Sequence, residues 1–396
     1  MPKTFRRDRE TWFTFFLLAI FGYFLNILGP ITPFLREELK TTYTVAGFHF
    51  SAFAIGMLVA GLLGDRVLIR FGYRTTLGAS AAGICTGAIA LILGRNVILT
   101  ISASFFMGIL GSFTLVLVPS MLSLKYKDTS AIALTELNTV ASLVGMLAPL
   151  IVGAMAATVL GWRFAVILSV FVVVLMGVGY RQIEFTTFPK PNRPSPKKRV
   201  RLPLHYWIFW LGVFLVVAVE FCFIFWGSNY LIENAGIQTK GASSSISLFL
   251  GAMLLGRWFG SRILRKTQPW LVLLVSLVLA LAGFFLFWSQ TSPFFSLTGF
   301  FLAGLGVANL YPISLDRAIS SVPSSLSSLA SARGALASAS AILTLPLLLG
   351  NLADKMGMHF AFLVVPVLII LTSILQIVLT NKVKTDRIVQ LEIDNL

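Results

Sequence analysis

The stretch YWIFWLGVFLVVAVEFCFIFWGSNYLI, from Tyr206 to Ile232, contains one charged residue, Glu220, and is otherwise almost entirely apolar. A helix needs about 20 residues to cross a bilayer, and this stretch is longer. It therefore predicts a membrane-spanning helix. A carboxyl group near the middle of such a helix is costly, so it indicates a functional site.

The rest of the chain has the same character. Of its 396 residues, 57% are hydrophobic and 12% are charged, and the mean hydropathy is +0.88. A soluble domain carries about twice that share of charge, which it needs to cover its surface. The composition therefore excludes a soluble enzyme, a nucleic-acid module and a secreted scaffold. Cys85 and Cys222 lie far apart in apolar runs, so neither a disulfide framework nor a zinc site is predicted.

Twelve apolar runs are predicted to span the membrane, which makes the fold class an all-α integral membrane protein. Residues 181–205, rich in Pro, Lys and Arg, are predicted to form a solvated linker. The linker divides the chain into a six-helix bundle at 1–180 and a second bundle with a short tail at 206–396. The predicted spans are 12–34, 43–63, 75–94, 97–123, 130–157, 163–180, 206–232, 241–260, 269–289, 293–315, 329–350 and 359–380.

The positive charges predict the orientation. Of the 31 Lys and Arg residues, 25 fall on the side of the N-terminus, the linker and the C-terminus, and 6 fall on the other side. The positive-inside rule then places both termini and the linker in the cytoplasm, with the chain in the inner (plasma) membrane. Because the basic residues are spread over all the inner segments, the net charge of +16 does not indicate a nucleic-acid partner.

The two halves repeat each other at a nearly constant offset. Gly161-Trp-Arg-Phe-Ala before span six recurs 196 residues later as Gly357-Met-His-Phe-Ala. Pro149-Leu-Ile-Val-Gly recurs as Pro346-Leu-Leu-Leu-Gly. Both halves begin on the inside, so we expect parallel pseudo-repeats related by an axis along the membrane normal, with a binding site between them at mid-depth.

One sequence motif follows span two. It reads Gly61-Leu-Leu-Gly-Asp65-Arg66, with Gly72-Tyr-Arg74 a little further on. This resembles the G-x-L-x-D-R-x-G-R motif of the major facilitator superfamily, with three extra residues before the Gly. The resemblance covers essentially the whole chain, and spans seven and ten look most like the fucose-permease-like branch. It implies alternating access, with this loop as a gating motif that locks the two halves together in one state.

The chain also departs from that family at two places. Ser104 stands where many members carry an Arg tied to proton coupling, and span four has no charge. The antiporter motif of span five survives only as Ala148-Pro149 and Gly153. Neither the usual coupling Arg nor an export signature is therefore present.

Glu220 is the predicted proton-coupling residue. It lies 14 residues into span seven, or about 20 Å, and so near the midplane. A carboxyl buried away from other charges could take up and release protons as its access to water changes. The alternative is a neutral Glu hydrogen-bonded for packing. Glu136, one turn into span five, could serve a gate, a salt bridge or a substrate contact, and His49 is a further titratable candidate.

Polar and aromatic side chains within the spans are predicted to line the substrate cavity. For the asparagines, the alternative is a hydrogen bond between helices. For Trp226, it is packing or a place in the interfacial aromatic belt. The predicted cavity residues are Tyr23, Asn26, Asn138, Phe223, Trp226, Tyr230 and Asn309.

The sequence shows no phosphate-binding Gly loop, no metal-ligand cluster and no nucleophile set, so we expect no enzymatic activity, no cofactor and no metal. The predicted function is secondary active transport of a small organic solute by alternating access, coupled to protons. We expect a monomer whose partners are its substrate, protons and membrane lipids. The alternatives are an uncoupled facilitator or a drug-type efflux pump and, in another class, a lipid flippase or a non-transporting receptor.

Overall fold

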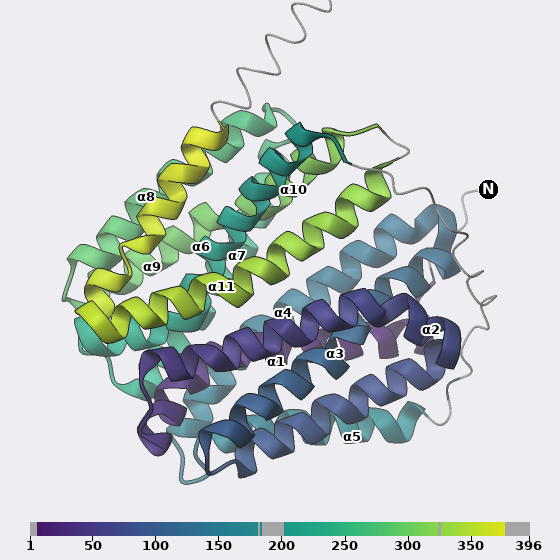
Figure 1. The fold of residues 1–396 in the computed structure, drawn as a ribbon, viewed down its shortest axis with the longest axis horizontal. Helices are drawn as coiled ribbons and strands as arrows, with labels where there is room; N and C mark the ends of the chain where they lie inside the picture. The colour runs from purple at the N-terminus through teal and green to yellow at the C-terminus, as the bar shows by residue number, and fades with distance from the viewer. Residues whose placement is uncertain (1–5, 181–182, 184–201, 324–325, 377–396) are drawn as a thin grey trace, which may run out of the picture.

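The computed structural model describes residues 6–180, 183, 202–323 and 326–376 and is built from long helices (Figure 1). The predicted linker and C-terminal tail lie almost wholly outside these residues, so the predicted domain boundaries stay predictions. The helices of the first half are α1 (Arg9–Leu39), α2 (Tyr43–Leu93), α3 (Val97–Tyr126), α4 (Ser130–Ala156) and α5 (Arg163–Tyr180). Those of the second half are α6 (Leu204–Ala235), α7 (Thr239–Ile263), α8 (Pro269–Ser289), α9 (Pro293–Val307), α10 (Leu310–Ser320) and α11 (Ser327–Ala361).

The predicted all-α membrane fold is confirmed. Within the described residues, 9 helical segments are long and apolar enough to cross a membrane, and the two shorter apolar helices are Arg163–Gly179 and Val364–Gln376. Together with α7, whose run of Ser and Gly makes it less apolar, these segments match the twelve predicted spans. The tenth span is in two pieces, because the helix is interrupted between α9 and α10.

Glycines in the left-handed region of φ mark the reversals between spans. Gly72 (φ 77°) is the residue with non-helical dihedrals inside α2, and it separates the second and third spans. The predicted loop at 64–74 is thus mostly helical. Gly161 (φ 72°) and Gly357 (φ 82°), which open the repeated five-residue stretch, share this conformation. Glycine adopts it without steric cost, so the repeat in the sequence is also a repeat in the backbone.

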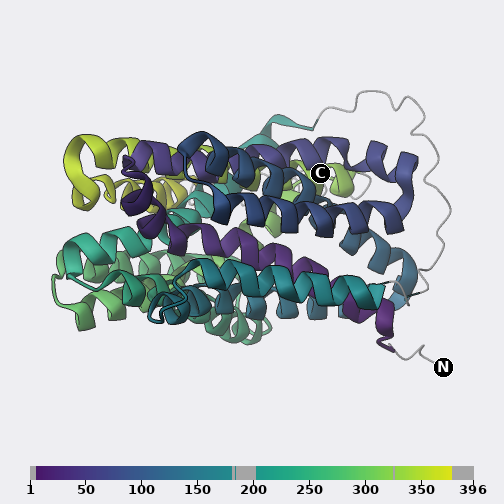
Figure 2. The ribbon, with the colours of Figure 1, turned by 90° about the horizontal axis from the view of Figure 1, so that it is seen from below.

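The two halves lie side by side, with α1–α5 in one and α6–α11 in the other (Figure 1). The helices run lengthwise between two ends of the molecule (Figure 2). We call the end where α1 and α6 begin, at Arg9 and Leu204, the linker end. We call the end where these helices finish, at Leu39 and Ala235, the far end.

Candidate transport site and gates

The two halves meet at the far end through a charged cluster. The Arg36 guanidinium of α1 donates a hydrogen bond of 3.1 Å to Asn229 Oδ1 of α6 and lies 4.0 Å from the Glu233 carboxylate. It also lies 3.3 Å above the centre of the Tyr43 ring, a cation–π contact. This cluster borders a polar pocket of about 270 Å³.

A helix cap also crosses the boundary between the halves. The Asp354 carboxylate of α11 accepts hydrogen bonds from the backbone N–H groups of Tyr43 (2.7 Å) and Thr44 (2.8 Å). These are orphan donors in the first turn of α2, where the helix dipole also favours a negative charge. The Thr42 hydroxyl, which belongs to the first half like α2 itself, accepts a hydrogen bond from Val45 N–H. The start of α2 is therefore stabilised by the opposite half.

Below this cluster the halves pack closely. The Phe50 ring of α2 stacks on Phe225 of α6, with 4.0 Å between ring centroids, and Trp226 packs edge-on against Phe50 at 5.3 Å. The helix backbones of α1 and α6 nearly touch: a Cβ added to Gly29 would lie 2.1 Å from the Ile224 carbonyl oxygen. Only glycine fits this approach.

The hydrogen bonds that Arg36, Tyr43 and Thr44 make across the boundary lie in the far half of the molecule. The deepest examples on α2 and α4 are Ser51 to the Leu343 carbonyl (2.8 Å) and Ser247 to the Met146 carbonyl (2.6 Å). Ser51 is eight residues into α2, about 12 Å from the far end. We call the set of contacts from Arg36 to Ser51 the far-end interface.

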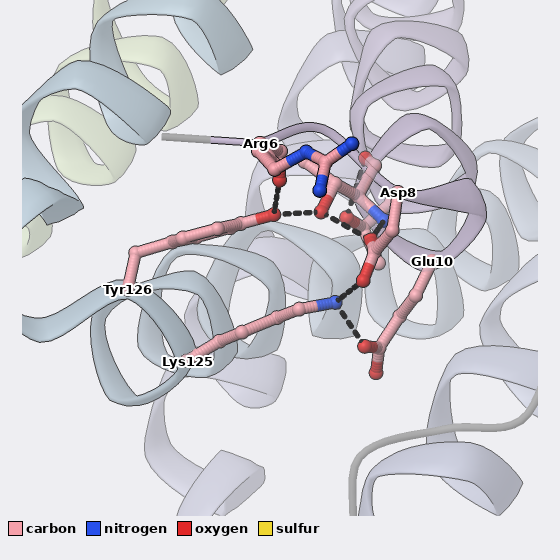
Figure 3. Close-up of polar contacts among 7 residues, drawn as sticks. Arg6, Asp8, Glu10, Lys125 and Tyr126 are labelled. Atoms are coloured by element: carbon pink, nitrogen blue, oxygen red, sulfur yellow. Dashed lines mark hydrogen bonds and ion pairs between the residues drawn. The ribbon is translucent and has the colours of Figure 1, made fainter. Parts of the chain in front are cut away.

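At the linker end, the described polar contacts lie within one half. Figure 3 shows the Lys125 ammonium of α3 between the carboxylates of Asp8 and Glu10, which flank the start of α1. The pKa of the Asp8 carboxyl is raised by partial burial, but hydrogen bonds from Lys125 and Thr11 outweigh this and hold the pKa below its ordinary value. These contacts join α3 to α1 within the first half.

Glu136 forms a salt bridge rather than facing a midplane site. Its carboxylate accepts two hydrogen bonds from Arg7, at 2.5 and 2.7 Å. This bidentate pair raises the pKa of the Arg7 guanidinium. His49 is also occupied: its ring nitrogens contact the Ala46 carbonyl (3.1 Å) and the Thr100 hydroxyl (2.9 Å), and the ring is buried. His49 is thus a satisfied packing residue of the first half.

Glu220 lies at mid-depth, as predicted, but it is not isolated from other charges. Arg257 Nη2 of α7 lies 3.8 Å from Glu220 Oε1. The side chain of Glu220 is 14% exposed and that of Arg257 is 39% exposed. Arg257 Nε donates to the Ala308 carbonyl at 3.2 Å, at the break between α9 and α10. The expectation that Glu220 is buried away from charge is therefore wrong, because α7 carries a guanidinium to the same depth.

Two further groups complete this cluster, which we call the Glu220–Arg257 site. The Tyr311 side chain of α10 lies within electrostatic reach of both charges and near Ser338 of α11. The site therefore draws on α6, α7, α10 and α11, all of the second half. A paired acid and base in a membrane interior is the arrangement that marks transport pathways.

The register of α4 against α7 places the first half opposite this site. Gly153 faces Ser244, and Met146 faces Ser247 and Gly251, so the helices run antiparallel. Continuing this register brings Thr139 opposite Arg257. Asn138, next to Thr139, is exposed, and its amide donates only to the Leu134 carbonyl of its own helix (2.9 Å).

Asn26 lies at the depth of Glu220, because its neighbour Gly29 contacts Ile224 one turn further along α6. The Asn26 side chain is half-buried, and its amide donates to the Gly22 carbonyl at 2.8 Å. Asn26 and Asn138 are thus the predicted cavity residues of the first half whose side chains keep some exposure. Tyr23 is buried, and its hydroxyl donates to the Ala165 carbonyl of α5 at 2.9 Å.

The predicted aromatic residues of α6 are fully buried here. Phe223 sits among the rings of the second half, at 5.1 Å from Phe249 and 5.8 Å from Phe287. The Tyr230 hydroxyl donates to the Trp288 carbonyl at 2.8 Å. Trp226 donates to the Pro346 carbonyl at 2.7 Å within the far-end interface. Their role as cavity residues stays a prediction, and in this conformation they pack the core and the interface.

Asn309 occupies a different place. It is buried at the break between α9 and α10, and its amide donates to the Gly256 carbonyl at 3.0 Å. A Cβ on Gly260 would lie 2.2 Å from Asn309 Oδ1, so glycine makes room for the amide. Asn309 forms part of the wall of an apolar groove of about 300 Å³ between α7, α8 and α9.

The predicted gating motif lies at the linker end of α2. Gly72 makes the reversal, and the neighbouring Tyr73 hydroxyl contacts the Ser120 hydroxyl of α3 at 3.1 Å. Gly61 and Arg66 are exposed, and so is Arg74. The side chain of Asp65 lies outside the described residues. The locking role of the motif stays a prediction.

Sequence reasoning missed Arg257, Asp354 and Arg36. Arg257 lies inside the predicted span 241–260, and the argument applied to Glu220, that charge within a span marks a pathway, would have found it. It was counted instead with the inner basic residues. Asp354 and Arg36 lie between predicted spans, and nothing in the sequence indicates that they meet the opposite half.

Two six-helix halves sealed at one end, with a charged site at mid-depth, are the construction of a two-bundle membrane transporter. A family model described as Major Facilitator Superfamily matches residues 14–343. The chain therefore belongs to the major facilitator superfamily. Fucose-permease-like placement within the family stays a prediction.

Curated relatives and solved structures agree at the level of the family and the fold. The Protein TsgA homolog of Erwinia tasmaniensis is 22% identical over 90% of this chain and 91% of its own length. The Putative metabolite transport protein YwtG of Bacillus subtilis is 23% identical over 44% of this chain, a match that spans 39% of YwtG.

Two solved structures share the fold. A D-xylose-proton symporter has a TM-score of 0.75 at 14% identity and covers 93% of this chain and 96% of its own. A variant of the nucleoside transporter NupG has a TM-score of 0.75 at 13% identity and covers 92% of this chain and 99% of its own.

Proposed function

We propose that this protein is a secondary active transporter that moves a small organic solute by alternating access, coupled to protons through Glu220. The observation that carries the proposal is the Glu220–Arg257 site. It lies at mid-depth, both side chains keep exposure, and the far-end interface seals the halves beyond it. We further propose that the linker end is cytoplasmic and that the protein resides in the inner membrane.

The described conformation then corresponds to a transporter closed at the far end and accessible from the linker end. Alternating access requires the far-end interface to break and a contact to form at the linker end. The Gly61–Arg74 motif is the group we propose for the second contact, since it lies at the linker end. One rocking motion of the two halves would then open the far-end interface as it closes the contact at the linker end, and the reverse.

Coupling follows if Glu220 changes its protonation between the two states. With the Arg257 guanidinium 3.8 Å away, Glu220 can be ionised in one state. In the other state, Arg257 moves further from Glu220 or binds the substrate instead, and Glu220 can then be protonated. If the free energy of protonating Glu220 differs by about 1.4 kcal/mol between the two states, substrate accumulation is biased about tenfold.

The test uses the Glu220→Gln variant, which mimics the protonated carboxyl. In proteoliposomes, it should lose accumulation driven by a pH gradient and keep counterflow exchange at equal pH. Glu136→Gln is the matched control, because that carboxylate pairs with Arg7 at the linker end. Undiminished gradient-driven accumulation by Glu220→Gln would place the coupling elsewhere.

An uncoupled facilitator is the second candidate, and one observation favours it. An acid held beside a guanidinium can act as a fixed ion pair that never exchanges its proton. In that case, the unmodified protein would equilibrate its substrate and show no dependence on the pH gradient. The same paired assays separate the two candidates.

A further inference from the structure

The chemistry of Arg257 indicates what kind of solute the site accepts. Its guanidinium is only partly used, because Nε donates to the Ala308 carbonyl and Nη2 lies 3.8 Å from Glu220, beyond hydrogen-bond distance. The Nη groups are therefore available to a ligand, and the side chain is 39% exposed at mid-depth. A planar fork of N–H donors matches a carboxylate, which can accept two parallel hydrogen bonds.

Among the described residues around the pair, none is a second cation that could share this role. The groups that face Glu220 from the elements packed on α6 are Arg257 of α7 and Tyr311 of α10. Among the described residues at that depth, α1 presents Asn26, and the stretches of α9 and α11 are uncharged. When Glu220 is ionised, the empty site therefore carries one positive and one negative charge.

Charge balance then decides the stoichiometry. An anion that binds Arg257 next to an ionised Glu220 leaves a net negative charge inside a low-dielectric boundary, which is unfavourable. A proton on Glu220 restores neutrality, so the loaded site has the same net charge as the empty site. One proton balances one negative charge, which fits a monocarboxylate better than a dianionic phosphate ester.

We propose that the solute is a small organic monocarboxylate, which displaces Glu220 from Arg257 as Glu220 takes up one proton. This inference rests on the proposed function and names its substrate class. Binding strengthens as pH falls, by about tenfold per unit while Glu220 is ionised in the empty site. The loaded carrier moves no net charge.

The first experiment measures binding by thermal shift in detergent. The ligands are a library of monocarboxylates and their neutral amides, with lactate against lactamide and nicotinate against nicotinamide as model pairs. We expect at least one carboxylate to stabilise the protein and its amide to fail. The proposal is overturned if the neutral amide binds as well as its carboxylate, or if no carboxylate in the library binds.

Variants assign the binding to Arg257. The double variant Glu220→Gln/Arg257→Gln removes both charges together and so leaves no unpaired ion, and it should lose carboxylate binding. Glu220→Gln alone should keep the binding and lose its pH dependence. Arg262→Gln, on the same helix but exposed and stacked on Trp258, is the control and should bind as the unmodified protein does. Retained carboxylate binding in the double variant overturns the proposal.

Flux separates this inference from the proposed function. In proteoliposomes, uptake of the bound carboxylate should not respond to an imposed potassium diffusion potential, because the carried charges cancel. Potential-dependent uptake contradicts the one-proton balance. If the carboxylate binds but no solute crosses, the transport function fails while the substrate class stands. If a neutral solute crosses without Arg257, the substrate class fails while transport stands.

Discussion

The two ends of the boundary between the halves differ in how they use polar groups. At the far end, Arg36 and Asp354 bind groups of the opposite half. At the linker end, Lys125 and Arg7 bind carboxylates of their own half. Similar chemistry thus serves two purposes: contacts between the halves hold them together at the far end, while contacts such as Lys125–Asp8 and Arg163–Glu38 stiffen a single half.

The far-end contact also involves the backbone. Gly29 of α1 approaches α6 so closely that an added Cβ would lie 2.1 Å from the Ile224 carbonyl oxygen. A transporter must release one gate without unfolding its halves. Contacts between the halves should therefore control the equilibrium between conformations, and contacts within a half should control stability. We call this the division between gating contacts and stabilising contacts.

The largest effect is expected for Gly29→Ala. The new Cβ would collide with the Ile224 carbonyl, which is backbone and cannot rotate away. Overpacking of this kind costs about 1–3 kcal/mol, enough to shift a two-state equilibrium by about 5- to 150-fold. We expect the far end to open. The measurement is electron–electron double resonance between spin labels at Lys40 and Lys355, in a background without Cys85 and Cys222.

Gly177→Ala is the matched control, because that glycine is exposed and has open space around it. It should leave the distance between labels unchanged and raise the melting temperature slightly, as Ala does in exposed helices. A far-end distance that stays short in Gly29→Ala would mean that the interface adapts by local repacking.

Asp354→Ala is expected to have a smaller effect of the same sign. It removes the acceptor for two N–H groups at the start of α2, and losing a helix cap costs about 1 kcal/mol. The far-open population should rise about fivefold in the same distance measurement. Asp8→Ala removes the equivalent cap of α1, where Asp8 accepts from Thr11 N–H at 2.9 Å within one half. It should lower the melting temperature and leave the far-end distance unchanged, and a similar shift in both variants would contradict the division.

The fold was predictable because a bilayer imposes a simple rule on the sequence. Apolar runs of the right length, the repeat at Gly161 and Gly357 and the motif after span two sufficed for twelve helices in two halves. The candidate site was predictable only in part. The depth of Glu220 along one helix singles it out as a candidate, which stays a prediction, but that depth does not reveal which neighbour faces it.

The residues that were missed share a physical reason. Arg257 reaches Glu220 because its long side chain extends from the linker side of α7, which a count of charges by segment cannot show. Asp354 caps a helix that begins 311 residues earlier in the chain. The burial of Phe223 and Tyr230 depends on how α6 is rotated against α8 and α9. Such facts depend on packing between helices, not on periodicity along one of them.

Asp65→Asn and Arg74→Ala test the linker end and should act in the opposite direction to Asp354→Ala. If the gating motif locks the halves in the state closed at the linker end, losing it should slow interconversion severalfold and favour the described conformation. Substrate affinity should stay within about twofold, because the motif lies far from Glu220. Stopped-flow fluorescence of a labelled protein measures the rates. Arg95→Ala, an exposed far-end arginine, is the control, and a large loss of equilibrium binding at normal rates would refute the locking role.

The smallest expected effect is the acid dependence of the α1 cap. Hydrogen bonds from Lys125 and Thr11 hold the pKa of Asp8 below its ordinary value of 3.8, so ionised Asp8 stabilises the fold above that value. This contribution disappears as pH falls through the lowered pKa of the folded state. Because Asp8 is partly exposed, we expect a fraction of a kcal/mol.

The melting temperature of Asp8→Asn should therefore lie slightly below that of the unmodified protein from pH 7 to about pH 4, with a constant difference, and the two should converge at lower pH. Since Asp8 acts within one half, the far-end distance should not follow this titration. A difference that grows on acidification would mean that burial, which raises the pKa, outweighs the donors. If the far-end distance changed together with the stability difference, a cap inside one half would be coupled to the far-end gate. Contacts within a half would then control the conformational equilibrium as well as stability, which contradicts the proposed division.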